Sequence, residues 1–286
     1  MTEHVMAAVD GSSFSASVCD YAAWASTALA TPLTFLHAVD NHPSTVDEPD
    51  LSGNLPLGAR EALLNELADL DEKRARINRE QGRLMLEEAC RRAGEQGVED
   101  ARSRQRNGTL VDTLAEYESQ MRLLVLGKRG ESADQASGHL GSNLERVVRE
   151  IRRPILMVPR AGFTRPKRVM FAFDGSKTAR KGVEMLARSP LFSGLFCHVV
   201  SVGADTAEHR MALAWAVDVL QQAGLEAEGS IRAGEVEATL HAFEADNEID
   251  ITVMGAYGHS RIRQFLVGST TTSMLRNAHV PVLILR

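Results

Sequence analysis

Short apolar runs alternate along the chain with longer segments in which apolar residues recur at helical spacing, and five such runs occur in each half. This alternation is typical of a parallel sheet whose strands are connected by crossover helices. We expect two tandem doubly wound α/β domains, each with a five-stranded parallel sheet, four helices and right-handed connections. The predicted strands are residues 4–9, 34–39, 98–104, 123–127 and 155–158 in the first half, and 168–173, 196–202, 225–232, 251–255 and 282–285 in the second.

The two halves repeat polar residues and glycines as well as apolar runs. Val5-Met-Ala-Ala-Val-Asp10-Gly-Ser in the first half corresponds to Val169-Met-Phe-Ala-Phe-Asp174-Gly-Ser in the second. Each copy continues to a glycine cluster and then to an apolar run that begins with proline. Because the repeat keeps an aspartate and glycines at predicted strand ends, it indicates a duplicated binding site in addition to a duplicated fold. The expected domains are residues 1–160 and 166–286.

An insertion distinguishes the first copy from the second, and most of its residues fall at 41–81. It begins with a loop rich in Pro, Ser and Asp and continues as a charged helical segment. Apolar residues recur there every seven positions, which makes a narrow seam. Two interpretations stay open: an extended crossover helix packed on its own sheet, and a helix that contacts a partner or a second copy. The seam comprises Leu63, Leu70, Ile77 and Leu84, with Leu67 beside them. Arg74 and Gln81 stand seven and fourteen residues after Leu67 and interrupt the second row of the seam. Gly82 could bend the helix.

Composition narrows the classes of partner. The chain has 286 residues, 44% of them hydrophobic, and a formal net charge of −6. This charge argues against a general nucleic-acid or anionic-membrane surface, and no apolar stretch approaches the roughly 20 residues of a spanning helix. Cys19, Cys90 and Cys197 are odd in number and widely spaced, so we expect reduced thiols rather than disulfides or a zinc site. The amino terminus lacks a basic region followed by an apolar one, so a cytoplasmic protein is expected.

Asp10 and Asp174 each follow the first predicted strand of their copy. Ligands of open parallel sheets sit beyond the carboxyl ends of the strands, where a carboxylate can accept hydrogen bonds from ribose hydroxyls or an exocyclic amine. The alternative is that each aspartate only orders the Asp-Gly-Ser turn or caps the next helix.

Glycines lie at the end of the fourth predicted strand and after it, at the same edge of the sheet. Glycine lets backbone approach phosphate oxygens closely, and the free N–H groups at a helix start attract their charge. Serine or threonine hydroxyls at that start could donate further hydrogen bonds. The alternative is a glycine-rich turn with a serine helix cap. The residues concerned are Gly127, Gly130, Gly141 and Ser142 in the first copy and Gly255, Gly258, Gly268, Ser269 and Thr270 in the second.

In these features the sequence resembles a tandem universal stress protein of the ATP-binding subtype. The resemblance rests on strand-Asp-Gly-Ser, on the strands around His37 and His198, and on G-x2-G-x9-G-[ST] before the last helix. It implies the Rossmann-like fold of the adenine nucleotide alpha hydrolases, and ATP or another adenine nucleotide, with or without Mg²⁺, as cofactor. It also implies that Asp10 and Asp174 contact adenosine and that backbone near Ala38 and Val199 meets adenine. The first copy departs from the pattern by having ten residues between Gly130 and Gly141.

The resemblance implies a stress-response regulator that acts through an unidentified protein partner, without nucleic acid or membrane insertion. One alternative is a slow ATP hydrolase or phosphotransfer enzyme. The chain has no G-x4-G-K-[ST] loop and no evident general base beside the glycines, and His139 and His259 are interpreted as solvent-facing loop residues. The other alternative is a scaffold whose pockets are vestigial.

The resemblance also suggests how the two copies are joined. Each copy ends in an apolar strand, and exposed strand edges favour pairing. Relatives of this kind pair their last strands across a dimer. We expect the two copies to do so within one chain, as a pseudo-twofold unit, and a homodimer of tandem chains stays open.

Overall fold

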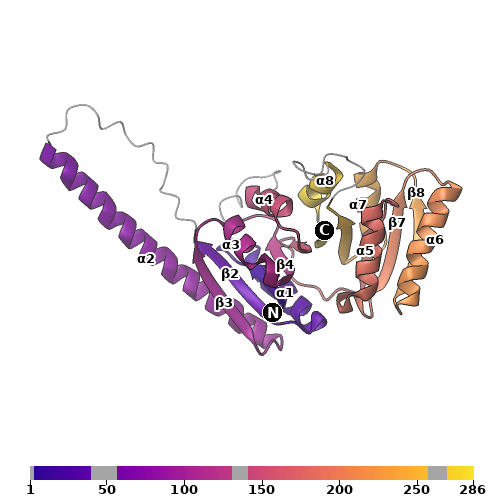
Figure 1. Cartoon of the computed structure of the whole chain (residues 1–286), viewed down its shortest axis with the longest axis horizontal. Coiled ribbons are helices and arrows are strands. Elements are labelled where there is room, and N and C mark those ends of the chain that lie inside the picture. Colours follow the sequence, from indigo (N-terminus) through magenta and orange to yellow (C-terminus); the bar gives the residue numbers. More distant parts are fainter. Residues whose placement is uncertain (1–2, 40–56, 131–140, 257–268) are drawn as a thin grey trace.

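The computed structural model describes residues 3–39, 57–130, 141–256 and 269–286, and its strands form one ten-stranded sheet (Figure 1). The strand order is β3-β2-β1-β4-β5-β10-β9-β6-β7-β8. Each half therefore has the order 3-2-1-4-5, with parallel ladders throughout, as the apolar alternation predicted. The strands are β1 (His4–Ala8), β2 (Leu33–Val39), β3 (Ala101–Asn107), β4 (Met121–Gly127), β5 (Ile155–Val158), β6 (Arg168–Ala172), β7 (Phe196–Val202), β8 (Glu226–Arg232), β9 (Ile251–Gly255) and β10 (Val282–Leu285).

The halves meet at their last strands. β5 and β10 pair antiparallel, with Leu156 opposite Leu283, and all four residues of each strand are buried. This pairing confirms the expected pseudo-twofold unit within one chain. It also converts two apolar strand edges into the centre of the sheet.

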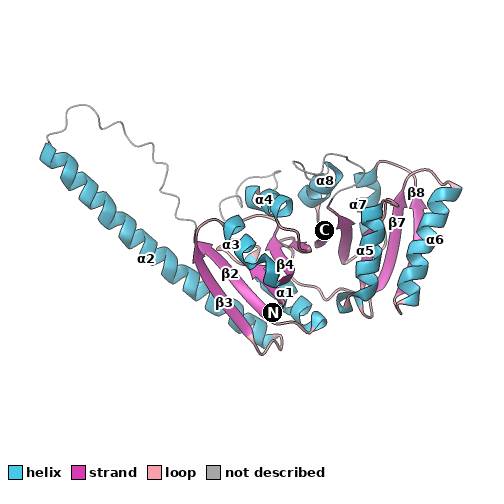
Figure 2. Cartoon of the chain, viewed as in Figure 1, coloured by secondary structure: helices cyan, strands magenta, loops and turns pink. Residues whose placement is uncertain are grey.

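Helices cover both faces of the sheet, so that the molecule has three layers (Figure 2). Their apolar sides pack on two core clusters, one on each face of the sheet. The face that carries Phe35 and Phe171 is covered by α1 (Ser15–Leu29), α2 (Leu57–Glu95), α5 (Lys177–Arg188) and α6 (Ala207–Gln222). The other face is covered by α3 (Leu110–Tyr117), α4 (Ser142–Glu150), α7 (Val236–Asp246) and α8 (Ser269–Asn277).

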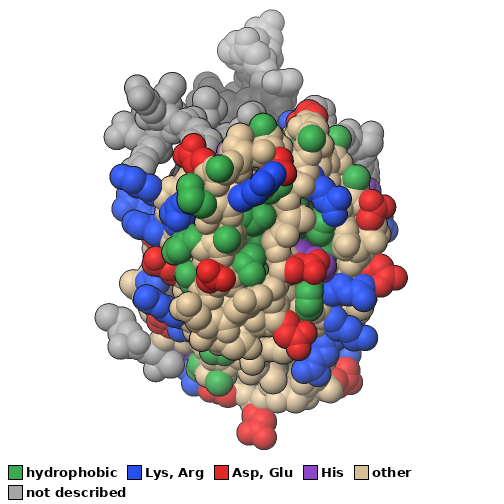
Figure 3. Space-filling view, turned by 90° about the vertical axis from the view of Figure 1, so that its right-hand side faces the viewer, with side chains coloured by type: hydrophobic (Ala, Val, Ile, Leu, Met, Phe, Trp, Pro, Cys, Tyr) green, Lys and Arg blue, Asp and Glu red, His purple; other side chains and the backbone are tan. Residues whose placement is uncertain are grey.

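The two outer strands of the sheet, β3 and β8, are polar. β3 reads Ala-Arg-Ser-Arg-Gln-Arg-Asn and is mostly exposed, and β8 carries Glu226, Glu228 and Arg232. Figure 3 shows acidic and basic side chains interspersed at the end of the molecule formed by the second half. Charged edge strands disfavour pairing with another sheet, which agrees with the junction lying at β5 and β10 instead.

The third strand begins later than its predicted start at Val98. The N–H of Gly97 bonds to the carbonyl of Gly94, and the N–H of Val98 bonds to that of Ala93. Gly97 has φ +87°, so it closes the end of α2 in the left-handed conformation that glycine adopts without strain. Val98 therefore belongs to the helix cap, and β3 extends instead to Asn107, which pairs with Val39.

Helix α2 packs on its own sheet over only part of its length. Near its carboxyl end Leu86, Ala89 and Ala93 are buried against the sheet. Toward its amino end the helix projects beyond the sheet (Figure 1). The helix continues through Gly82 without a break. A Cβ at this position would lie 2.6 Å from His37 Cδ2 and 2.5 Å from Gln105 Nε2. The glycine thus allows the helix to pack closely on β2 and β3.

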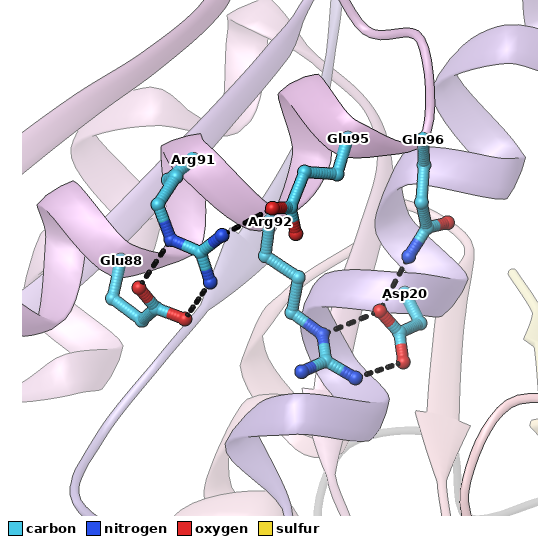
Figure 4. Close-up of polar contacts among 6 residues, drawn as sticks. All are labelled: Asp20, Glu88, Arg91, Arg92, Glu95 and Gln96. Atoms are coloured by element: carbon cyan, nitrogen blue, oxygen red, sulfur yellow. Dashed lines mark hydrogen bonds and ion pairs between the residues drawn. The ribbon is translucent and has the colours of Figure 1, made fainter.

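A buried carboxylate fixes the base of α2 to α1. Asp20 accepts hydrogen bonds from Arg92 Nε at 2.6 Å and Nη2 at 2.7 Å, and from the Gln96 side-chain amide (Figure 4). The Asp20 side chain is 8% exposed, whereas that of Arg92 is 39% exposed. On the outer face of the same helix Arg91 pairs with Glu88 and Glu95, and all three side chains are more than half exposed. Of these ion pairs, the bidentate pair between Arg92 and the buried Asp20 contributes most to stability.

The cysteines are free thiols, as expected. Burial raises the pKa of Cys19 and of Cys197 to about 12, so both are protonated and inert at neutral pH. Cys90 is partly exposed, and burial raises its pKa to a smaller extent. Within the described ranges, no helix has the length and apolarity needed to cross a membrane.

Candidate nucleotide site

A cavity of about 100 Å³ opens at the carboxyl ends of β1 and β4 in the first half. These strands are adjacent in the sheet, and the chain leaves them toward opposite faces, which is the usual place of a ligand in an open α/β sheet. Five residues predicted from the sequence line the cavity: Asp10, Ala38, Gly127, Gly130 and Gly141. A ligand pocket typically holds about 300–1,000 Å³, so only part of a nucleotide would fit inside and the rest would extend past the mouth.

Asp10 orders the turn that follows β1. Its Oδ1 accepts hydrogen bonds from the Ser12 N–H at 3.1 Å and from the Ser15 hydroxyl at 3.4 Å. Asp174 Oδ1 accepts the equivalent bond from the Ser176 N–H at 3.0 Å. Both aspartates therefore order the Asp-Gly-Ser turn, which was the alternative to ligand binding. It does not exclude ligand contact, because two carboxylate oxygens offer about four acceptor sites.

Gly130 brings the loop backbone against the Asp10 carboxylate. A Cβ built on Gly130 would lie 2.9 Å from Asp10 Oδ2, and one built on Gly127 would lie 2.7 Å from Phe14 Cβ. Real Cβ atoms avoid contacts shorter than 3.0 Å. Both positions therefore require glycine if the cavity is to keep this shape, whereas a Cβ on Gly141 would meet neighbours only at 3.4 Å or more.

The start of helix α4 adds backbone donors. Gly141 is its N-cap residue and provides no side-chain cap for the first N–H groups of the helix. These groups and the positive end of the helix dipole favour an anion. The sequence had placed Gly141 and Ser142 at the start of this helix, and the structure agrees for the backbone.

The lining also includes two polar residues with long or amide side chains that were not singled out from the sequence, Arg129 and Asn143. Arg129 lies between Gly127 and Gly130 and supplies positive charge at the mouth. The neighbouring Lys128 points elsewhere: its Nζ donates to the Ala278 carbonyl at 3.1 Å, across the junction of the two halves. Burial, and then the charge of Arg129, lower the pKa of Lys128. The glycine cluster was visible, but only the fold separates the roles of its two basic residues.

The second copy places its corresponding residues at the carboxyl ends of its own strands, which form the opposite edge of the ten-stranded sheet because β5 and β10 are antiparallel. Gly255 ends β9, Asp174 follows β6 and is exposed, and Thr270 is exposed in the first turn of α8. Thr271, which sequence reasoning missed, is buried and donates to the Ala256 carbonyl at 3.3 Å, tying α8 to the strand end. Gly258, Gly268, His139, His259 and the side chains of Ser142 and Ser269 lie outside the described residues.

Val199 does not occupy the position expected from the resemblance. The β1–β2 ladder pairs Val5 with Leu33, and the equivalent β6–β7 ladder pairs Val169 with Cys197. Counted from these pairs, Ala38 corresponds to Val202. Val199 lies inside the sheet with 0% exposure, so its backbone cannot meet a ligand at the strand ends. Aligning the two copies by His37 and His198 shifts the second strand of one copy by three residues relative to the other. The two histidines occupy different positions in their strand ladders.

Among the described residues, no group of three or more His, Cys, Asp or Glu side chains could hold a metal ion. The cavity contains one carboxylate, Asp10, and one guanidinium, Arg129. Its donors and glycines fit a polyanion with a hydroxylated or amino-bearing group better than they fit a bare cation.

Comparison with known proteins gives a consistent result. The model described as "Universal stress protein family" matches residues 1–159 and again 166–286. The chain is 36% identical over 287 residues to a curated protein of Synechocystis sp. named universal stress protein Slr1230, covering 99% of this chain and 100% of the relative.

A solved structure of similar length has the same fold. A universal stress protein from Archaeoglobus fulgidus superposes with a TM-score of 0.65 at 17% identity, covering 99% of this chain and 96% of that one. A shorter universal stress protein, solved in complex with cAMP, covers 43% of this chain and 98% of its own, with 22% identity and a TM-score of 0.38.

Proposed function

The chain belongs to the universal stress protein family, and we propose that it is a member that binds ATP or another adenine nucleotide and regulates a protein partner according to nucleotide occupancy. The observation that carries the proposal is the convergence of Asp10, Ala38 and three loop glycines on one cavity. Gly130 and Gly141 both border this cavity. A bound nucleotide would contact both residues and so alter the surface that a partner meets.

The residues fit such a ligand in type and position. Asp10 would accept from the ribose hydroxyls, and Ala38 would lie against the base. Gly127, Gly130 and Gly141 would admit the phosphates, whose charge Arg129 and the start of α4 would balance. If Mg²⁺ accompanies the nucleotide, the phosphate oxygens of the nucleotide would be its ligands. In the second copy we assign the same roles to Asp174, Val202, Gly255, Gly258, Gly268, Ser269 and Thr270.

The decisive experiment is mass spectrometry of small molecules released from the purified, unheated chain, followed by calorimetry with ATP, ADP, AMP and cAMP. We expect an adenine nucleotide to be released or to bind with at least micromolar affinity. If none of the four binds at millimolar concentration, the scaffold interpretation with vestigial pockets holds instead. A nucleotide of another base would retain the phosphate site and overturn the adenine assignment.

Hydrolysis should be slow or absent. Of the residues that line the cavity, Asp10 and Arg129 are the ones that carry charge, and Asp10 already holds the Asp-Gly-Ser turn. Positioning groups without an activated water give little acceleration. We therefore expect phosphate release far below the typical enzyme turnover of about 10 per second. Multiple-turnover release with ATP and Mg²⁺ is the measurement, and a rate near that scale would favour an ATP hydrolase.

The second copy should bind the nucleotide more tightly than the first. Its nine-residue spacer between Gly258 and Gly268 fits the family pattern, whereas the first copy has ten residues. In calorimetry, Gly268→Val should remove the tighter binding event and Gly130→Val the weaker one. The reverse assignment would show that spacer length does not set the order of affinity.

A further inference from the structure

Helix α2 carries an exposed apolar stripe, which we call the arm seam: Leu63, Leu67, Leu70, Ile77 and Leu84. These side chains are 39%, 52%, 54%, 55% and 52% exposed. They make up five of the eight exposed large hydrophobic side chains in the described part of the chain. At a rise of about 1.5 Å per residue the arm seam is about 30 Å long. Exposed apolar side chains repeated along one helix face favour a contact site.

The arm seam faces away from its own domain. Gly82 and Leu86 are buried against the sheet, while Leu84 between them is 52% exposed on the other side of the helix. Residues two apart on a helix point to nearly opposite sides. A second helix could therefore lie along the whole seam without meeting the sheet. The Asp20–Arg92 pair anchors the carboxyl end of the helix to α1 (Figure 4).

The charges of the arm are divided into two blocks. Residues 65–72 include four acidic side chains and no basic one, which gives −4, and residues 73–83 include five basic and one acidic, which gives +4. The boundary lies near the middle of the arm seam. A helix with this distribution is complementary to a second copy of itself only when the two run antiparallel, because a parallel pair would place like charges together.

We propose that two copies of the chain associate through α2 as an antiparallel helix pair whose twofold axis passes near residue 72. In this register Leu67 packs against Ile77 of the second copy. Arg74 and Gln81, which interrupt the seam within one chain, each oppose a leucine of the other chain. An arginine stem can cover a leucine while its guanidinium reaches the acidic block of the partner copy. The seven-residue spacing favours the left-handed supercoil of such a pair. The proposal is independent of nucleotide binding.

The first test is the mass of the full chain by sedimentation velocity between about 1 and 50 µM. We expect a species of twice 31.2 kDa. A triple variant, Leu67→Gln, Leu70→Gln and Ile77→Gln, should raise the dissociation constant at least 100-fold. Ala68→Gln is the control, since Ala68 is exposed on the other side of the helix and should leave the dissociation constant unchanged. A monomeric wild-type chain, or a dimer that survives the triple change, would overturn the proposal.

The second test addresses orientation. Reversing the basic block (Lys73→Glu, Arg76→Glu, Arg79→Glu) or the acidic block (Glu66→Lys, Asp69→Lys, Asp71→Lys) should each weaken the homodimer at least tenfold, and mixing the two variants should restore a heterodimer. For the wild-type chain, salt should weaken an antiparallel dimer by screening its attraction. A dimer that salt strengthens would be parallel and would contradict the proposed pairing. Circular dichroism confirms that each variant keeps its helices.

Discussion

Replacing Gly130 with valine should lower the nucleotide affinity of the first copy at least 100-fold, which corresponds to about 3 kcal/mol. A Cβ at this position would already lie 2.9 Å from Asp10 Oδ2, and the two methyl groups of valine would extend further. Either the carboxylate or the loop backbone must then move. Both line the cavity, so the site cannot keep its shape. Calorimetry should record one fewer nucleotide bound per chain.

Two matched variants separate this effect from general damage to glycine positions. Gly141→Ala also lies in the cavity wall, but its Cβ would meet neighbours only at 3.4 Å or more, so the affinity should fall far less. Gly162→Val lies where a Cβ would meet nothing within 4 Å and should change neither folding nor binding. An unchanged affinity in folded Gly130→Val would show that the first cavity is not a nucleotide site.

The parallel sheet of each half, and the placing of Asp10 and the glycines at one edge of it, could be predicted because both depend on local patterns. Apolar alternation gave five strands in each half, and parallel strands necessarily bring their carboxyl ends to one edge. Asp10 follows β1 and Gly127 ends β4, and these strands are neighbours, so both residues lie at the same part of that edge. The prediction used the positions of the strand ends and no side-chain detail.

Register could not be predicted in the same way. His37 and His198 look equivalent in sequence. The strand ladders nevertheless make Val202, and not Val199, the residue that corresponds to Ala38. A shift of three residues along a strand alters no apolar pattern strongly enough to be noticed when both faces of the strand are buried. Val98 was assigned to a strand for a related reason: an apolar residue after a helix can either cap it or begin a strand.

The division of α2 into a packed base and a projecting arm also depends on tertiary structure. The seven-residue seam was visible, but the second apolar face, with Leu86, Ala89 and Ala93, was not singled out because its spacing overlaps the same helical period. Only the position of the sheet decides which face is covered. Arg129 and Lys128 show the same limit, since adjacent basic residues point into different surroundings.

Replacing Arg92 with methionine should destabilise the first half by about 3 kcal/mol, because it leaves the Asp20 carboxylate buried without its cationic partner. The Asp20 side chain is 8% exposed and would keep the hydrogen bond from the Gln96 amide. This remaining bond places the cost at the lower end of the range for broken buried pairs. Urea unfolding followed by Trp24 on α1, in a Trp215→Phe background, measures the change with a probe that lies in this half.

The direction of the asymmetry makes this prediction specific. Asp20→Ala should cost less than Arg92→Met, because the Arg92 side chain is 39% exposed and can turn its guanidinium to solvent. Arg91→Met removes two ion pairs from the outer face of the same helix, where all partners are more than half exposed, and should leave the unfolding midpoint unchanged. If Arg91→Met shifts the midpoint as much as Arg92→Met, helix propensity rather than the buried pair holds α2 to α1. Equal losses from Asp20→Ala and Arg92→Met would instead mean that the cost lies in packing and not in the stranded carboxylate.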